Sequence, residues 1–158
     1  MNKTEAGTTS VSRKKKAARC SPPVRYITAL TTGLEARPSP LHGLGCFATQ
    51  PFRKGRKIAE YGGAVVRYDN LTEEESRWDF NHIVGLDDEW VIDGNRGGNL
   101  TKYINHSCDA NMYMRVTRGH AIFYALRDIA PGEELTWAYY IMDDDGRIDP
   151  CPCEKSAS

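Results

Sequence analysis

The sequence of 158 residues lacks any run of about 18 consecutive apolar residues, and this absence excludes a predicted transmembrane helix. Its basic N-terminus is not followed by an apolar segment, so a secretory signal peptide is not expected. It also lacks internal repeats and coiled-coil heptads. With 40% hydrophobic residues, the chain is expected to form one globular domain inside the cell, with no membrane partner.

Cysteine is scarce and odd in number. The five cysteines are Cys20, Cys46, Cys108, Cys151 and Cys153. An odd set in an expected intracellular protein favours free thiols or metal ligands over a framework of disulfides.

A net charge of zero conceals two regions of opposite sign. Residues 1–25 contain seven Lys and Arg against one Glu, a charge of +6, whereas residues 26–158 contain fourteen against twenty, a charge of −6. Residues 1–23 are small, polar and basic, which predicts a disordered tail. Its basic residues 13–25 can bind phosphates or serve as a nuclear address, but a solvated tail is the favoured interpretation. The acidic remainder favours a basic partner over nucleic acid.

The rest of the sequence predicts a mostly β domain with short helices. Short stretches of β-branched and aromatic residues alternate with Gly and Pro turns. The predicted strands are residues 26–30, 45–48, 57–61, 64–66, 80–86, 90–93, 112–116, 121–125 and 135–140, of which 112–116 and 121–125 are expected to form a hairpin. Thr72 and Glu75 match a capping box, which predicts a short helix through Trp78. A second short helical or irregular segment is expected between residues 97 and 105.

Two local patterns suggest ligand contacts. Gly43 and Gly45 lack a Cβ, so the backbone can approach a ligand closely, although a simple turn is the favoured interpretation. The pattern lacks the third glycine and the following helix of a dinucleotide-binding motif, so NAD binding is not expected. Residues 105–111 are rich in polar side chains and offer an amide beside an imidazole. That stretch alone leaves a functional site and a structural turn equally open.

Several motifs taken together resemble one family. In order they are His42-Gly43-Leu44-Gly45-Cys46-Phe47-Ala48, Ile58-Ala59-Glu60-Tyr61-Gly62-Gly63, Val91-Ile92-Asp93, Gly98-Asn99, Tyr103-Ile104-Asn105-His106-Ser107-Cys108 and Gly132-Glu133-Glu134-Leu135-Thr136-Trp137-Ala138-Tyr139. In this order and spacing they resemble the SET-domain protein lysine methyltransferases. The resemblance implies a SET-domain (β-clip) fold over residues 24–142, with small twisted sheets and a knot-like C-terminal thread, and an incomplete post-SET-like segment at residues 143–158.

The resemblance also implies a donor and a set of site residues. The methyl donor is expected to be S-adenosylmethionine and the acceptor a lysine side chain. The implied donor-binding residues are Gly43, Leu44, Gly45, Tyr61, Asn105, His106 and Tyr139. Tyr139 is the implied catalytic tyrosine, Tyr61 is assigned to catalysis beside it, and Tyr103 and Trp137 are the implied walls of the lysine channel.

The chemistry agrees with the lack of an obvious Ser, His and Asp catalytic set. Methyl transfer from a sulfonium to an amine requires a neutral amine, and only about one free lysine in a thousand is neutral near pH 7, a cost on the order of 4 kcal/mol. An apolar aromatic channel and a nearby sulfonium both lower the lysine pKa, so no dedicated base is needed. What remains is alignment of the nitrogen, the methyl group and the sulfur.

The sequence departs from the family at several positions. Trp137 stands where the family usually has Phe or Tyr, and its bulk predicts a monomethyl product. Ala110 replaces a usual Pro and should matter little, and Ala138 replaces a common acidic residue with a consequence that the sequence does not explain. Cys108, Cys151 and Cys153 match a post-SET zinc site, but Ser158 stands where the fourth thiolate is expected. Because structural zinc normally has four protein ligands, a metal-free tail is favoured over zinc.

The leading hypothesis is a protein-lysine methyltransferase that acts on a basic segment, with histone-like tails as candidates. One alternative is a SET-like module that binds a partner without catalysis. The other is nucleic-acid association through the basic tail, which predicts strongly salt-dependent binding. The expected location is nuclear or chromatin-associated for a eukaryotic source, and cytoplasmic or delivered into a host for a bacterial one. The sequence leaves the oligomeric state open.

Overall fold

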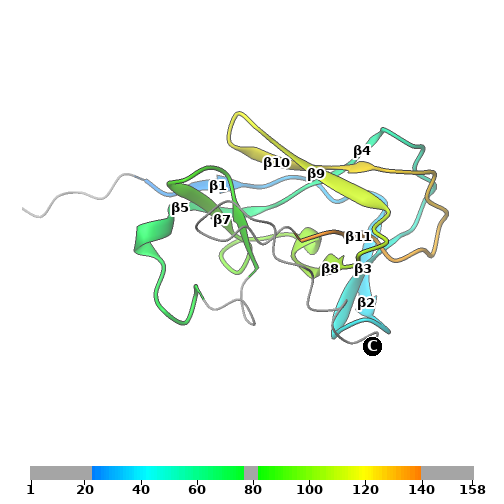
Figure 1. Cartoon of the computed structure of the whole chain (residues 1–158), viewed down its shortest axis with the longest axis horizontal. Helices are drawn as coiled ribbons and strands as arrows, with labels where there is room; N and C mark the ends of the chain where they lie inside the picture. The colour runs from blue at the N-terminus through cyan, green and yellow to red at the C-terminus, as the bar shows by residue number, and fades with distance from the viewer. Residues whose placement is uncertain (1–22, 77–81, 140–158) are drawn as a thin grey trace, which may run out of the picture.

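The computed structural model describes residues 23–76 and 82–139, and within these residues the chain forms short β-strands and two 3-10 helices. The strands pair into three small sheets, of four, five and two strands (Figure 1). The fold class is therefore mostly β, as the sequence predicts. None of the helices in the described residues is long and apolar enough to cross a membrane.

The four-stranded sheet has the order β1-β5-β7-β6 and is antiparallel throughout. Its strands are β1 (Arg25–Ile27), β5 (Gly63–Arg67), β6 (Ile83–Gly85) and β7 (Trp90–Asp93). β5 is buried over its first four residues and β7 over its last three, which explains their runs of small and β-branched side chains. The strands predicted for residues 26–30 and 80–86 are shorter in the structure.

The five-stranded sheet has the order β4-β10-β9-β11-β8. Its strands are β4 (Lys57–Glu60), β8 (Asn105–His106), β9 (Met112–Thr117), β10 (His120–Ala125) and β11 (Thr136–Trp137). β9 and β10 form the predicted hairpin. The two residues of its turn, Arg118 and Gly119, have φ angles of 49° and 75°, and two consecutive positive φ values suit the right-handed twist of a hairpin.

The third sheet pairs β2 (Leu34–Pro38) with β3 (Leu44–Ala48). β3 was predicted, but β2 was not. Of the five residues of β2 only Leu34 is buried, so the strand has no apolar alternation to detect. Its pairing places the loop at residues 39–43 next to β3.

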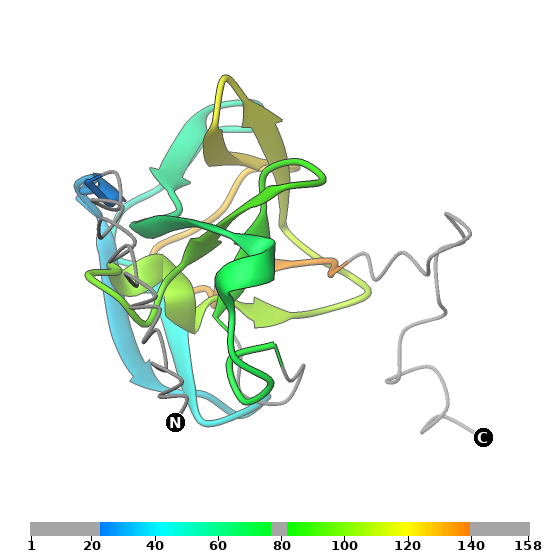
Figure 2. The ribbon, with the colours of Figure 1, turned by 90° about the vertical axis from the view of Figure 1, so that its left-hand side faces the viewer.

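The core lies between the sheets. The largest fully buried apolar side chains belong to Phe123, Ile92, Met112, Ile129 and Leu135. They come from β10, β7, β9 and the segment that leads into β11, so the core joins the four- and five-stranded sheets. In Figure 2 the orange end of the described chain runs out from among the green segments, and Leu135, which leads into β11, is fully buried.

The helical segments differ from the prediction at one place. Thr72 and Glu75 do form a reciprocal capping box, because each backbone N–H donates to the other's side-chain oxygen, at 2.8 and 3.2 Å. However, residues 73–76 form a turn rather than a helix, so the helix predicted from Thr72 is wrong there, and its remaining residues lie outside the described part. The segment expected between residues 97 and 105 contains the 3-10 helix η2 (Leu100–Tyr103), and the other such helix, η1 (Tyr68–Asn70), follows β5.

The predictions for the two ends of the chain fall outside the described residues. These are the disordered tail of residues 1–23, except for Pro23, and the post-SET-like segment of residues 143–158, which includes Cys151 and Cys153.

Candidate active site

Two strands that are distant in sequence lie side by side at the centre of the candidate site. β11 pairs in parallel with β8, with Thr136 opposite Asn105 and Trp137 opposite His106. On its other edge β11 pairs with β9. Because β11 lies between them, the segment predicted to hold the donor and the segment that ends in Tyr139 are brought together.

A buried asparagine fastens this junction. Asn111 is 3% exposed, and its Nδ2 donates to the carbonyl of Glu134 at 2.7 Å. Its Oδ1 accepts from the backbone N–H of Thr136 at 2.9 Å. The Asn111 amide therefore satisfies two backbone groups, the carbonyl of Glu134 and the N–H of Thr136, which would otherwise need partners from a neighbouring strand. The start of β11 is set by this side chain.

Asn105 connects β8 to the loop before β3. Its Nδ2 lies 3.1 Å from the carbonyl oxygens of both His42 and Leu44, and 2.9 Å from Oε1 of Glu134. The predicted donor-binding residues Asn105 and Leu44 are thus held in contact. These bonds also fix which end of the amide faces the loop.

The two glycines of this loop have different surroundings. A Cβ on Gly43 would meet no atom within 4 Å, and its φ of +46° favours glycine. A Cβ on Gly45 would lie 2.3 Å from Oε1 of Glu134 and 2.9 Å from Cβ of Ser39. The space that glycine creates at position 45 is therefore filled by the chain's own side chains. The open approach expected from both glycines is found at Gly43.

Tyr139 follows β11 and turns its hydroxyl into the domain. The hydroxyl donates to the carbonyl oxygen of Ile104 at 2.6 Å, and the backbone N–H of Tyr139 donates to Nδ1 of His106 at 2.9 Å. The residue remains 44% exposed, so part of it stays accessible while the hydroxyl is anchored. Burial of the hydroxyl raises the pKa of Tyr139 to about 12, so the group is protonated near neutral pH.

His106 packs against Tyr139 with ring centroids 5.2 Å apart. Burial lowers the pKa of His106, and a backbone hydrogen bond with Trp137 partly opposes that effect, so the neutral imidazole is favoured. Its Nε2 lies 3.5 Å from Sγ of Cys108. Across residues 23–76 and 82–139, no three His, Cys, Asp or Glu side chains gather as metal ligands would.

Tyr61 directly follows β4 and is almost fully buried, with 4% exposure. Its hydroxyl donates to the carbonyl oxygen of His82 at 2.8 Å. Burial raises the pKa of Tyr61, and the nearby charges of Tyr139 and Asp93 raise it further. A series of ring contacts connects the two predicted catalytic tyrosines, from Tyr61 through Phe123 and Trp137 to Tyr139.

Both predicted channel residues pack against other aromatic rings of the site. Trp137 stands between Phe123 and Tyr139, with ring centroids 5.7 and 5.0 Å away. Tyr103, at the end of η2, meets the imidazole of His82 at 6.2 Å between centroids. His82 therefore links Tyr103 to Tyr61, since its carbonyl accepts from Tyr61.

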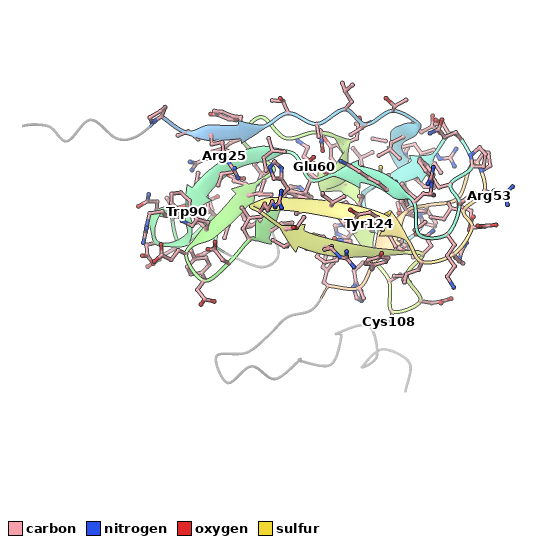
Figure 3. The ribbon with its side chains drawn as sticks, turned by 90° about the horizontal axis from the view of Figure 1, so that it is seen from above. Arg25, Arg53, Glu60, Trp90, Cys108 and Tyr124 are labelled. Atoms are coloured by element: carbon pink, nitrogen blue, oxygen red, sulfur yellow. The ribbon has the colours of Figure 1, made fainter. Side chains whose placement is uncertain are left out.

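Two surface cavities lie elsewhere. One of about 310 Å³ is lined by Arg25, Trp90 and five other residues, and one of about 220 Å³ by Arg25, Glu60 and their neighbours. Figure 3 shows Arg25 and Trp90 well away from Cys108, which follows β8. None of the residues that line these cavities belongs to the predicted site.

Three polar residues shape the site without having been assigned a role from the sequence: Asn99, Asn111 and Glu134. Asn99 donates from Nδ2 to the carbonyls of Ala29 and Glu60, at 3.1 and 3.0 Å, and caps η2 by accepting from the N–H of Thr101. All three stand within the quoted motifs or the polar stretch of residues 105–111. Their partners, however, are distant in sequence, so no local pattern indicates what they bind.

This arrangement offers two neutral tyrosine hydroxyls and a fixed amide. Each hydroxyl donates its hydrogen to a backbone carbonyl, so its oxygen lone pairs remain able to accept an N–H or a polarised C–H. Aromatic rings lie beside both tyrosines, Phe123 beside Tyr61 and Trp137 beside Tyr139. Such a site can orient an amine and exclude water from it.

Comparison with known proteins gives the family. The SET domain model matches residues 43–140. Histone-lysine N-methyltransferase TRX1 of Oryza sativa subsp. japonica is 40% identical over 126 residues, and histone-lysine N-methyltransferase trithorax of Drosophila virilis is 36% identical over 124 residues. A chain in the structure of ctPRC2 in complex with H3K27me3 and H3K27M superposes with a TM-score of 0.63, at 26% identity over 70% of this chain and 15% of that one.

Each of the two enzyme relatives aligns with 73% of this chain, but the alignment covers only 12% of the rice protein and 3% of the Drosophila protein. The match to the SET domain model, at residues 43–140, includes every predicted site residue from Gly43 to Tyr139. The resemblance seen in the sequence motifs is confirmed, and the chain belongs to the SET domain family.

Proposed function

We propose that this chain is an S-adenosylmethionine-dependent methyltransferase that methylates a lysine side chain of a basic protein, with the histone H3 tail as the first candidate. The observation that carries the proposal is the placement of Tyr139. Its hydroxyl is anchored on the carbonyl of Ile104 beside Trp137 and His106, while the residue stays partly exposed to an incoming substrate.

The residues present fit the donor. Gly43 leaves open space in its loop, and the carbonyls on either side of it, of His42 and Leu44, accept hydrogen bonds from Asn105. Asn105 and His106 form β8, and His106 pairs with Trp137 of β11. We assign the donor to Gly43, Leu44, Gly45, Tyr61, Asn105, His106 and Tyr139. When bound, S-adenosylmethionine would supply a methyl group activated by a positively charged sulfur.

Tyr139 would orient the acceptor. Its hydroxyl hydrogen is committed to Ile104, so the oxygen can accept an N–H from a neutral lysine amine and leave the nitrogen lone pair pointing elsewhere. Because burial holds the pKa of Tyr139 near 12, the hydroxyl stays neutral across the physiological range and neither adds nor removes a proton. Its role is therefore alignment rather than general base catalysis.

The aromatic walls would lower the pKa of the substrate lysine. Trp137 and Tyr103 present ring faces and edges, which solvate an ammonium less well than water does. Desolvation favours the neutral amine that the reaction needs. Tyr61 borders the same region from the buried side through its contact with Phe123, at 6.4 Å between centroids.

Two observations support a histone H3 substrate. One relative, histone H3-lysine(4) N-trimethyltransferase ATX1 of Arabidopsis thaliana, is 37% identical over 126 residues and is named for that activity. Residues 26–158 of the chain carry a charge of −6, which favours a basic tail. We therefore propose chromatin as the place of action. Association with nucleic acid through residues 13–25 remains a secondary prediction.

Zinc remains a separate prediction. Cys108 lies in the described part of the chain, next to His106, while Cys151 and Cys153 lie outside it. Metal analysis of protein purified without chelators decides the question. Zinc close to one equivalent would support the three-thiolate site, and zinc at background would favour the metal-free tail.

A labelling experiment tests the proposed function. The full chain is incubated with methyl-labelled S-adenosylmethionine and a mixture of core histones and cellular proteins, beside Tyr139→Phe. We expect label on lysine in the histone H3 band from the unaltered chain, and little from the variant. Donor binding without transfer to any lysine would instead favour the partner-binding module.

A further inference from the structure

We propose that Glu134 is a positioning residue for the methyl donor, which it serves by fixing the orientation of the Asn105 amide. This inference rests on the proposed function, because it assumes that Asn105 contacts S-adenosylmethionine. Glu134 itself has no assigned contact with donor or lysine. Its half-buried carboxylate lies between the loop at residues 39–43 and β8.

The carboxylate joins two parts of the site, the loop that contains Ser39 and the strand that contains Asn105. Oε1 of Glu134 accepts from Nδ2 of Asn105 at 2.9 Å and from the hydroxyl of Ser39 at 2.7 Å, and Oε2 lies 2.9 Å from the same hydroxyl. Ser39 Oγ in turn accepts from the backbone N–H of Leu41 at 2.9 Å. Glu134 therefore couples the loop that carries Gly43 to the strand that carries Asn105.

An ionised carboxylate can only accept hydrogen bonds. The carbonyls of His42 and Leu44 are also acceptors, so all three neighbours select the NH₂ end of the Asn105 amide. The amide oxygen is consequently turned away from them. We infer that this oxygen accepts an N–H of the donor, and that Glu134 strengthens the hold of the two carbonyls on the NH₂ group, so that the amide does not flip.

The backbone around Glu134 is built to hold the carboxylate. A Cβ at position 45 would collide with Oε1 of Glu134, so any larger residue there would push the carboxylate out of its present place. Glu134 forms an antiparallel bridge with Phe47, and the N–H of Leu135 donates to the carbonyl of Cys46 at 2.7 Å. In agreement with a nearby negative charge, the pKa of the Cys46 thiol is raised to about 12, by burial first and by Glu134 second.

The neighbouring carboxylate provides a matched control. Glu133 binds Arg127 at 2.8 Å and the backbone N–H of Ala130, both in the segment between β10 and β11. Glu133→Gln removes the same charge one residue away and leaves the bonds of Asn105 in place. Glu134→Gln keeps the size of the side chain but removes its charge and one of its two acceptor oxygens, so the hold on the NH₂ group of Asn105 is weakened while the carbonyls of His42 and Leu44 remain.

The test measures the affinity of the full chain for S-adenosylmethionine by calorimetry, together with the rate of lysine methylation at saturating donor. We expect Glu134→Gln to raise the dissociation constant about tenfold and to change the saturated rate by less than about threefold. Glu133→Gln should leave both values unchanged. An unchanged donor affinity in Glu134→Gln would overturn the proposal.

A double-mutant cycle tests whether Glu134 acts through Asn105. In an Asn105→Ala background, Glu134→Gln should change the dissociation constant by less than about twofold, whereas a persisting tenfold effect would overturn the proposal. If Glu134→Gln shows no cooperative thermal unfolding, Ser39→Ala replaces it, with an expected rise of about threefold that is also lost in the Asn105→Ala background. A wild-type chain that binds no S-adenosylmethionine would overturn the proposed function as well, which separates the two failures.

Discussion

The two tyrosines of the candidate site occupy regions that are built in different ways. Tyr61 is 4% exposed and is enclosed by packing, since a Cβ on Gly94 would lie 2.8 Å from its hydroxyl. Tyr139 is 44% exposed and is held mainly by hydrogen bonds, to Ile104 and His106. Both hydroxyls nonetheless donate to a backbone carbonyl. The same chemical group is therefore fixed from the inside in one region and left accessible in the other.

Because of this difference, the regions around Tyr61 and Tyr139 should respond to different kinds of substitution. A packed region tolerates little added volume but contains few polar groups that depend on one another. A region of two-residue strands joined by side-chain amides depends on those amides and tolerates open space at its surface. We therefore expect the Tyr61 region to respond to volume and the Tyr139 region to respond to polarity. The following predictions test that division.

The largest expected effect is the loss of Asn111. Asn111→Ala leaves the buried carbonyl of Glu134 and the N–H of Thr136 without their partner, which should reduce the free energy of unfolding by about 3 kcal/mol. Chemical denaturation of the full chain measures the change. Asn95→Ala, an exposed asparagine, should change it by less than about 0.5 kcal/mol. Equal stability of the two variants would mean that polarity does not hold this region together.

A smaller loss is expected from added volume beside Tyr61. In Gly94→Ala the new methyl group would lie 2.8 Å from the Tyr61 hydroxyl and 3.1 Å from the His82 carbonyl, so overpacking should cost about 2 kcal/mol. Gly85→Ala is the matched control, because a Cβ there meets nothing within 4 Å. The same denaturation experiment compares them. A Gly94→Ala protein as stable as Gly85→Ala would contradict the packed description.

The sequence predicted the packed region more completely than the hydrogen-bonded one. The hairpin of β9 and β10 and the buried strands β5 and β7 follow from local apolar patterns and turn residues. β8 and β11 have only two residues each, and their pairing depends on Asn111, which binds across more than twenty residues of sequence. The family motifs identified Asn105, His106 and Tyr139 as site residues, but no local signal gives the partners of Glu134 or Asn99.

Alkaline pH should destabilise the protein through its buried tyrosines. Burial raises the pKa of Tyr61 and Tyr139 above the unfolded value of 10.0, so their contribution to stability is complete below about pH 10. It is then lost as the pH rises toward about 12 for Tyr139, and at still higher pH for Tyr61. Chemical denaturation at several values from about pH 9 to about pH 11 measures how steeply the free energy of unfolding falls with pH. In Tyr61→Phe the free energy of unfolding should fall less steeply with pH. An unchanged dependence would show that Tyr61 does not contribute to the alkaline loss of stability.

The smallest expected effect is on the product. Trp137 lies 5.0 Å from Tyr139 between ring centroids, and its indole should limit the methylated lysine to one methyl group. Trp137→Phe should then increase the dimethyl fraction while the thermal stability changes little. Mass spectrometry of the modified substrate measures the distribution. Abundant trimethyl product from the unaltered chain would contradict this assignment.

A matched pair of tyrosine variants tests the central claim most directly. Single-turnover methylation of histone H3 is measured for Tyr139→Phe and Tyr61→Phe, together with the thermal stability of each. The account predicts that Tyr139→Phe slows transfer about 100-fold or more in a folded protein, because an orienting group is lost. It predicts that Tyr61→Phe mainly loses stability, by about 1 to 2 kcal/mol, because the His82 carbonyl loses a donor. Transfer at the wild-type rate by Tyr139→Phe would contradict the account.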